Sequence, residues 1–249
     1  STSVSIAALP VANAGADITI CDGDSIAIGG SPTGPGGSSF SWSPSATLNS
    51  GSNANPEATP LITTDYIVLV SNSGCTDQDT IRVNVSVPSV SAGTDLAVCV
   101  GDSVQIQAQG TGSVVWSPAG GLSATNVLDP FAFPIATTDY IVTLTDSATC
   151  IAQDTIQVLV NQLPVANAGA DTSACTNEMI VIGGAPTGPS GSTYTWSPAG
   201  GLSDANSANP TATITGTQIY TVTVTDSSTC SSTDVITINA LAIPNVDAG

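Results

Sequence analysis

Apolar and polar side chains alternate along several short segments of this chain. From Tyr220 onward, Tyr220, Val222 and Val224 fall on one side of an extended chain, and threonines fall on the other. The segment that begins at Tyr140 repeats this pattern. A period of two that is rich in β-branched residues is typical of a half-buried β-strand. No stretch shows a convincing helical period, so the pattern predicts an all-β protein.

Further alternating segments lie before and after these strands. An early segment alternates over residues 104–108 and a late one over 156–160, with counterparts at 26–28 and 236–238. Turn-forming runs such as CDGD at residues 21–24 separate the segments. Short strands between frequent turns predict a β-sandwich.

The strand pattern occurs three times, because the chain repeats itself. The string PVANAGAD occupies residues 10–17 and recurs unchanged at 164–171, and a variant of it occupies 88–95. A fixed period of this kind indicates an array of modules. The period predicts the end of a preceding repeat at 1–9, complete repeats at 10–87, 88–163 and 164–243, and the start of a following repeat at 244–249.

Each repeat carries the same ordered markers: a cysteine, a tryptophan, a tyrosine and a second cysteine. They are Cys21, Trp42, Tyr66 and Cys75, then Cys99, Trp116, Tyr140 and Cys150, then Cys175, Trp196, Tyr220 and Cys230. This order resembles an immunoglobulin-like module, which implies a tryptophan on the third strand and a tyrosine that opens the sixth, with its hydroxyl in a tyrosine corner. The second cysteine follows the tyrosine by nine or ten residues rather than two, which places it in the turn before the seventh strand.

The motifs AGAD, CDGDS, WSPAGGLS and TTDY resemble the PKD-like, immunoglobulin-like repeats of very long cell-surface and secreted proteins of Bacteroidota. The resemblance covers nearly the whole chain. It implies a rod-like tandem array of three β-sandwiches, used as an extracellular stalk or filament shaft, often on adhesins exported by type IX secretion and in some cases linked to gliding. The implied partners are the neighbouring repeats, other copies in a filament, and a glycan or surface ligand bound through regions outside this segment.

The charge of the chain excludes several classes of function. Nineteen acidic residues face a single cation, Arg82, and the formal net charge is −18. Nucleic acids and anionic membranes need a basic patch, so neither is an expected partner, and no apolar run is long enough for membrane insertion. Because the chain has no Lys and no His, only carboxylates remain as general acids or bases, and we expect no enzyme activity.

Six cysteines, two in each repeat, suit disulfides formed in an oxidising, extracellular compartment. One hypothesis pairs them within each repeat, as Cys21–Cys75, Cys99–Cys150 and Cys175–Cys230. The two turns lie at opposite ends of a sandwich, however, and a strand such as 151–160 spans roughly 30 Å. A disulfide needs Cα atoms within about 7 Å. Turn placement therefore favours a staggered pattern, Cys21–Cys150 and Cys99–Cys230, with Cys75 and Cys175 bonded to repeats outside this segment.

A calcium site is an alternative reading of the acidic residues. Carboxylates are the ligands that Ca²⁺ prefers, and five of them could converge where repeats one and two meet. These are Asp22, Asp24, Asp65, Asp95 and Asp146. A solvated acidic surface is the favoured interpretation, because the spacing of an EF-hand is absent. No cofactor other than calcium is expected.

Asp-Ser/Thr-hydrophobic triplets resemble the O-glycosylation motif of Bacteroidota. The hydroxyl residues concerned are Ser25, Thr80, Ser103, Ser147 and Thr155. Ordinary strand and turn chemistry predicts the same triplets, and repeat three has none. The sequence leaves both readings open.

Overall fold

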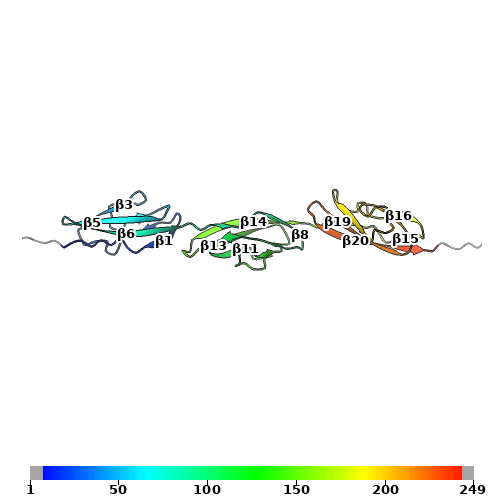
Figure 1. The fold of residues 1–249 in the computed structure, drawn as a ribbon, viewed down its shortest axis with the longest axis horizontal. Coiled ribbons are helices and arrows are strands. Elements are labelled where there is room, and N and C mark those ends of the chain that lie inside the picture. The colour runs from blue at the N-terminus through cyan, green and yellow to red at the C-terminus, as the bar shows by residue number, and fades with distance from the viewer. Residues whose placement is uncertain (1–7, 243–249) are drawn as a thin grey trace, which may run out of the picture.

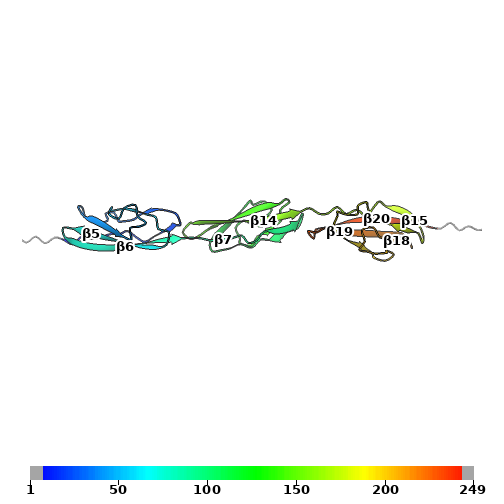
Figure 2. The ribbon, with the colours of Figure 1, turned by 90° about the horizontal axis from the view of Figure 1, so that it is seen from above.

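The computed structural model describes residues 8–242, which form three β-sandwiches arranged end to end along one axis (Figure 1). The view turned by 90° shows the same rod (Figure 2). The predicted fold class, an all-β tandem array of immunoglobulin-like sandwiches, is confirmed. Residues 1–7 and 243–249, where the period predicts parts of flanking repeats, lie outside the described residues. Within residues 8–242, no helix is long and apolar enough to cross a membrane.

Repeat one contains a four-stranded sheet and a short two-stranded ladder. Its strands are β1 (Ile18–Cys21), β2 (Ile26–Ala27), β3 (Ser39–Ser43), β4 (Glu57–Ala58), β5 (Thr64–Asn72) and β6 (Cys75–Ser86). The large sheet has the order β1-β6-β5-β3, and β2 pairs with β4. The strand β1 runs parallel to β6 and places Cys21 opposite Ser86, at the end where the chain leaves for repeat two.

Repeats two and three follow the same plan. Repeat two contains β7 (Val90–Ser91), β8 (Leu96–Cys99), β9 (Val104–Gln105), β10 (Gln109–Gly110), β11 (Ser113–Ser117), β12 (Phe131–Ala132), β13 (Thr138–Thr145) and β14 (Ile151–Asn161). Repeat three contains β15 (Thr172–Cys175), β16 (Met179–Val181), β17 (Thr193–Ser197), β18 (Thr211–Thr213), β19 (Gln218–Thr225) and β20 (Ser231–Leu241). Their large sheets have the orders β11-β13-β14-β8 and β15-β20-β19-β17.

The segment after each tryptophan strand forms a loop rather than the fourth strand of a seven-stranded sandwich. In repeat one this loop makes a single β-bridge, between Leu48 and Ala58. Its backbone instead turns toward Trp42, whose amide donates to Gly51 and whose indole N–H donates to the carbonyl of Asn53 at 2.9 Å. The tyrosine therefore opens the fifth of six strands in repeats one and three, and not the sixth of seven.

Each repeat has its own hydrophobic core, built around its tryptophan and tyrosine. All three tryptophans are at most 3% exposed, and the marker tyrosines Tyr66, Tyr140 and Tyr220 are at most 1% exposed. The tyrosine hydroxyls bond to the loop after the tryptophan strand: Tyr140 donates to the carbonyl of Gly120 and Tyr220 to that of Gly200, both at 3.1 Å. This differs from a tyrosine corner, in which the hydroxyl reaches only a few residues upstream.

The repeated string that contains AGAD or AGTD is fastened to the sheet by a carboxylate in each repeat. The amide of Ala14 donates to Asp79, that of Ala92 to Asp154 and that of Ala168 to Asp234, all at 2.8 Å. The three alanines are fully buried. A small side chain is required there because this segment lies directly against the core, so packing and hydrogen bonding account for the repetition of the string.

Candidate functional site at the joints between repeats

Two disulfides connect neighbouring repeats. Cys21 bonds to Cys150 with an S–S distance of 2.02 Å and a Cα–Cα distance of 5.4 Å. Cys99 bonds to Cys230 with a Cα–Cα distance of 5.6 Å. We call these places the first joint and the second joint. Both disulfides are those of the staggered pattern that turn placement favours. No disulfide pairs two cysteines of the same repeat in the described residues.

Strand directions explain this pairing. Because β1 runs parallel to β6, both strands end at the side of repeat one that faces repeat two, and Cys21 is the last residue of β1. The turn between β13 and β14 lies at the opposite end of its own sandwich, so it faces back toward repeat one (Figure 1). This turn carries Cys150. The same relation brings Cys99 at the end of β8 to Cys230 before β20.

A carboxylate shapes the turn that presents the second cysteine. Asp146 accepts hydrogen bonds from the amides of Ala148 and Cys150, both at 2.8 Å, and its own amide donates to the carbonyl of Cys150. Thr149 completes the turn with a φ of 67°. Asp226 holds the Cys230 turn through the corresponding bonds. Each joint therefore contains a second cysteine whose turn is held by an aspartate of its own repeat.

The first joint has a polar contact in addition to its disulfide. The hydroxyl of Ser86 in repeat one donates to the second carboxylate oxygen of Asp146 in repeat two. The Ser86 hydroxyl and the amides of Cys150 and Ala148 lower the pKa of Asp146, against the opposing effect of desolvation. Asp146 is thus an ionised acceptor that ties its own turn to the preceding repeat.

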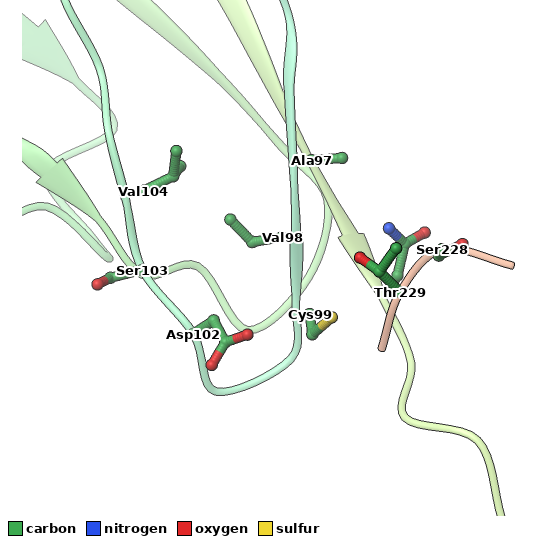
Figure 3. Close-up of a pocket in the computed structure, with 9 residues that line it drawn as sticks. Ala97, Val98, Cys99, Asp102, Ser103, Val104, Ser228 and Thr229 are labelled. Atoms are coloured by element: carbon green, nitrogen blue, oxygen red, sulfur yellow. The ribbon is translucent and has the colours of Figure 1, made fainter. Parts of the chain in front are cut away.

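The second joint is more open. Asn161 occupies the position of Ser86, since it lies opposite Cys99 in the parallel ladder. Within residues 8–242, no hydrogen bond connects repeat two to repeat three. A hollow of about 440 Å³ lies beside the disulfide, lined by residues that include Cys99, Asp102, Asn161, Ser228 and Thr229 (Figure 3). The disulfide and the linker are therefore the main connections at this joint.

The remaining two cysteines form no disulfide in the described residues. The turn between β5 and β6 and the end of β15, which carry them, lie near opposite ends of the rod (Figure 1). Cys75 opens β6 and is half-buried, whereas Cys175 ends β15 and is exposed. Cys75 follows a tight hairpin turn made by Ser73 and Gly74, both with positive φ. No pairing of these cysteines is formed within the described part of the chain.

The five carboxylates of the predicted calcium site do not converge. In the described ranges, no three His, Cys, Asp or Glu side chains are grouped so that they could hold a metal ion. Asp65 on β5 forms an ion pair with Arg82 at 3.7 Å, and Asp95 accepts from the amide of Gln157 at 2.9 Å. Asp146 is occupied by the Cys150 turn, which leaves Asp22 and Asp24 as exposed turn residues. The calcium site, which the sequence offered only as an alternative to a solvated acidic surface, thus has no cluster of ligands in the described residues, and the fold uses several of these side chains elsewhere.

The five hydroxyl residues of the triplets, Ser25, Thr80, Ser103, Ser147 and Thr155, are all exposed. Two of the neighbouring aspartates, Asp79 and Asp154, bind the backbone of the AGAD or AGTD segment. Asp234 does the same in repeat three without a following Ser or Thr. The fold thus explains the aspartates of the two triplets that begin at Asp79 and Asp154.

An apolar groove in repeat two is a feature that the sequence analysis missed. The side chains of Phe131 and Phe133 are about half exposed, and that of Ile135 is 88% exposed. A groove of about 380 Å³ runs between Phe133 to Ile135 and the paired glycines Gly120 and Gly121. The available signal was the position of two of the three phenylalanines, which lie two residues apart at 131 and 133.

No protein-family model matches this chain, and no curated protein matches it. Among solved structures, an I-band fragment of titin aligns with 95% of this chain and 100% of its own, at 11% identity and a TM-score of 0.48. Extracellular domains 3–5 of Drosophila OTK cover 94% of this chain and 97% of their own, at 11% identity and a TM-score of 0.36. Both are similar in overall plan only, and the fold of this chain follows from its own strand order.

Proposed function

We propose that this chain is a non-enzymatic structural segment of a large extracellular protein, acting as a stalk, spacer or filament shaft. The observation that carries the proposal is the disulfide at each of the two joints. Structural disulfides persist in oxidising compartments, which supports a location outside the cell. On the resemblance of its motifs, we assign the segment to a surface adhesin of Bacteroidota with PKD-like repeats.

The connectivity of the disulfides suits a chain that bears tension. A pull on the two ends reaches Cys21, crosses to Cys150, and then follows the backbone in reverse to Cys99. From Cys99 it crosses to Cys230 and leaves through β20. The residues 22–98 and 151–229 lie outside this shortest covalent path. Such a rod can extend only by the segment 99–150 and by its two ends, even after its repeats unfold.

The roles of the carboxylates support a structural function over catalysis. General acid–base chemistry in this chain depends on carboxylates, because Lys and His are absent from its sequence. Asp79, Asp154 and Asp234 accept from backbone amides, and Asp146 and Asp226 shape the joint turns. These carboxylates act as fixed hydrogen-bond acceptors for the fold.

Small-angle X-ray scattering tests the rod. We expect the variant with Cys21→Ser and Cys150→Ser to bend at the first joint, so that its radius of gyration falls and its maximum dimension becomes smaller. The matched control changes Cys75→Ser and Cys175→Ser, which removes the same number of sulfurs but no disulfide. The control should scatter as the unmodified chain does. Identical curves for all three proteins would mean that the disulfides do not hold the rod straight.

A second candidate function, recognition of a neutral glycan, is favoured by the groove in repeat two. Phe133 lines the groove, and Phe131, two residues earlier at the start of β12, is also about half exposed. Aromatic rings offer apolar faces against which sugar rings can pack. Repeat one has Glu57 and Thr59 at the corresponding positions, and repeat three has Thr211 and Thr213. A hollow in repeat three is lined by Gly201 and Thr213 at the positions of Gly121 and Phe133, so the aromatic lining, rather than the hollow, is specific to repeat two. The lining of the groove in repeat two carries no charge.

A glycan array measures this second activity. The unmodified chain should bind neutral glycans, and the variant Phe133→Thr, which copies repeat three, should lose at least tenfold in affinity. Leu61→Thr in repeat one removes another exposed apolar side chain and is the matched control. Equal binding by both variants would place any glycan contact elsewhere, and a chain that binds no glycan would eliminate this candidate.

A further inference from the structure

We propose that Cys75 and Cys175 are the two halves of a third joint, through which one copy of this chain bonds end to end to a second copy. The bond would connect Cys175 of one copy to Cys75 of the next. This inference rests on the proposed rod, and it names a second copy as the source of the outside repeats to which the sequence predicts that Cys75 and Cys175 are bonded. It is separable from the rod itself, whose two internal disulfides are already formed.

The β-ladders show that Cys175 is equivalent to the first cysteines of the formed joints. Cys21 lies opposite Ser86 in the parallel ladder of repeat one. Cys99 lies opposite Asn161, and Cys175 lies opposite Leu241, in the corresponding ladders. All three cysteines are the last residues of their strands. Cys175 therefore emerges from its sandwich in the same place as two cysteines that are bonded across joints.

Cys75 is equivalent to the second cysteines by the same criterion. In repeat two, Thr145 lies opposite Ile151, so the next pair toward the turn is Asp146 with Cys150. In repeat one, Ser71 lies opposite Thr76 and the next pair is Asn72 with Cys75. The turn of repeat one is one residue shorter. The ladder position of its cysteine is nevertheless the one from which Cys150 reaches repeat one.

The burial of equivalent cysteines shows what the third joint lacks. Among the second cysteines, the bonded Cys150 and Cys230 are at most 1% exposed and Cys75 is half-buried. Among the first cysteines, the bonded Cys21 and Cys99 are half-buried and Cys175 is exposed. The β5–β6 turn with Cys75 and the end of β15 with Cys175 lie near opposite ends of the rod, which is the placement that head-to-tail bonding requires (Figure 1). A bond within one copy would have to span the whole array, far beyond the reach of about 7 Å between Cα atoms.

The contacts at the second joint show that a disulfide joint does not depend on a polar contact. At the third joint, Leu241 and Asn72 would occupy the positions of Ser86 and Asp146. Leu241 has no side-chain donor, so the bond between Ser86 and Asp146 has no counterpart there. The second joint also lacks a hydrogen bond between its repeats in the described residues, yet Cys99 and Cys230 are bonded. The linker also connects the two repeats at the second joint, whereas at the third joint the disulfide would be the only covalent link between the copies.

The bond forms by thiol–disulfide exchange with a small disulfide such as oxidised glutathione. The Cys175 thiolate attacks one sulfur of the small disulfide and releases one small thiol. The Cys75 thiolate of the second copy then attacks the sulfur of Cys175 and releases the other small thiol. Two protein thiols are oxidised, one small disulfide is reduced to two thiols, and their two protons pass to the released thiolates.

The test mixes two variants of the full chain. Cys75→Ser retains only the Cys175 thiol, and Cys175→Ser, produced with ¹⁵N, retains only the Cys75 thiol. The two are mixed in equal amounts with oxidised glutathione at about 0.15 M salt, which screens the negative charge of both copies to a length of about 8 Å. Mass spectrometry then separates the mixed dimer from the two dimers of like chains.

We expect the mixed dimer to exceed each like dimer at least tenfold, and its peptides to contain a Cys175–Cys75 link. The unmodified chain should give a ladder of multimers on a non-reducing gel. Statistical pairing, or capping of both thiols by glutathione without dimers, would overturn the third joint. The double variant Cys75→Ser/Cys175→Ser must stay monomeric, and dimers of it would assign the linkage to the internal cysteines instead. A rod-like scattering curve for these monomers separates failure of the third joint from failure of the rod.

Discussion

At the scale of single residues, aspartate side chains accept the hydrogen bonds that fix two recurring parts of the repeats. Asp79, Asp154 and Asp234 fasten the N-terminal segment of each repeat, and Asp146 and Asp226 shape the turns that present cysteines. Hydrogen bonds to ionised acceptors are about twice as strong as neutral ones. The strong acidity of the chain is therefore partly a set of defined contacts, in addition to a surface charge that keeps neighbouring rods apart.

We expect Asp154→Ala to destabilise repeat two by about 1 kcal/mol. The variant loses an acceptor for the amides of Ala92 and Thr155, and we take the low end of the range for charged hydrogen bonds because the carboxylate is open to solvent. Asp24→Ala, which removes an exposed turn carboxylate with no side-chain hydrogen bond, should leave the stability unchanged within about 0.5 kcal/mol. Urea unfolding of the two variants measures the difference.

The same variant has a defined pH dependence. The amides of Ala92 and then Thr155 lower the pKa of Asp154 in the folded state, below the value of about 3.9 in an unfolded chain. The stabilisation is therefore complete above about pH 4 and disappears as the pH falls through the folded-state pKa. The stability difference between Asp154→Ala and the unmodified chain should shrink toward zero in acid. A difference that stays constant below pH 3 would assign the role of Asp154 to packing.

At the scale of elements, the strands could be predicted and several of their contacts could not. The alternation after Tyr220 specifies a strand because each second side chain enters the core. The partner of the tyrosine hydroxyl depends on a loop about twenty residues away, and no local pattern encodes it. The segment after each tryptophan strand has no periodic pattern, so the sequence did not show that it forms a loop instead of a regular strand. The cysteine pairs were accessible because strand direction decides which end of a sandwich carries each turn.

The modification, calcium and groove sites were hard to predict from the sequence, because the same residue type can serve either a site or the fold. The aspartate of the Asp79-Thr80 triplet suggests a modification motif, yet its contact with Ala14 explains it through the fold. The proposed calcium ligands included Asp65 and Asp95, which are adjacent to other strands and are used there. Whether a phenylalanine is core or surface depends on the face it occupies, so the exposed ring of Phe133 was not evident from its sequence neighbours.

Tyr140→Phe tests the contact between the tyrosine strand and the loop of Gly120. Loss of the 3.1 Å hydrogen bond should cost about 1 kcal/mol at neutral pH. Burial raises the pKa of Tyr140 above its usual value of 10.0. Because the folded-state pKa is the higher one, this stabilisation is present below about pH 10 and is lost as the pH rises through the folded-state pKa.

Thermal melting of the two proteins at several alkaline pH values follows this loss. The stability difference should decrease above about pH 10, where the unmodified chain alone must keep the Tyr140 hydroxyl protonated. Tyr194→Phe is the control, because the Tyr194 hydroxyl has no hydrogen-bond partner in the described residues and its ring is only half-buried. An equal alkaline response of both variants would show that the hydroxyl of Tyr140 has no special environment.

At the scale of the whole molecule, three small sandwiches are connected into one rod. A domain of this size has a small core and limited stability alone. The two disulfides add connections between repeats that hold even when a core opens. They also determine the covalent path that transmits force along the rod, and this path omits much of repeats one and three.

Single-molecule force spectroscopy on the full chain, pulled from its two termini, tests this claim most directly. In oxidising buffer the unfolding of repeat two should release only the segment 99–150, about 18 nm at full extension less the folded length, and the end segments should release a few nanometres each. After reduction, three events should each release about 27 nm less the folded length. Full-length releases in the oxidised chain, or the same pattern with and without reductant, would contradict the covalently connected rod.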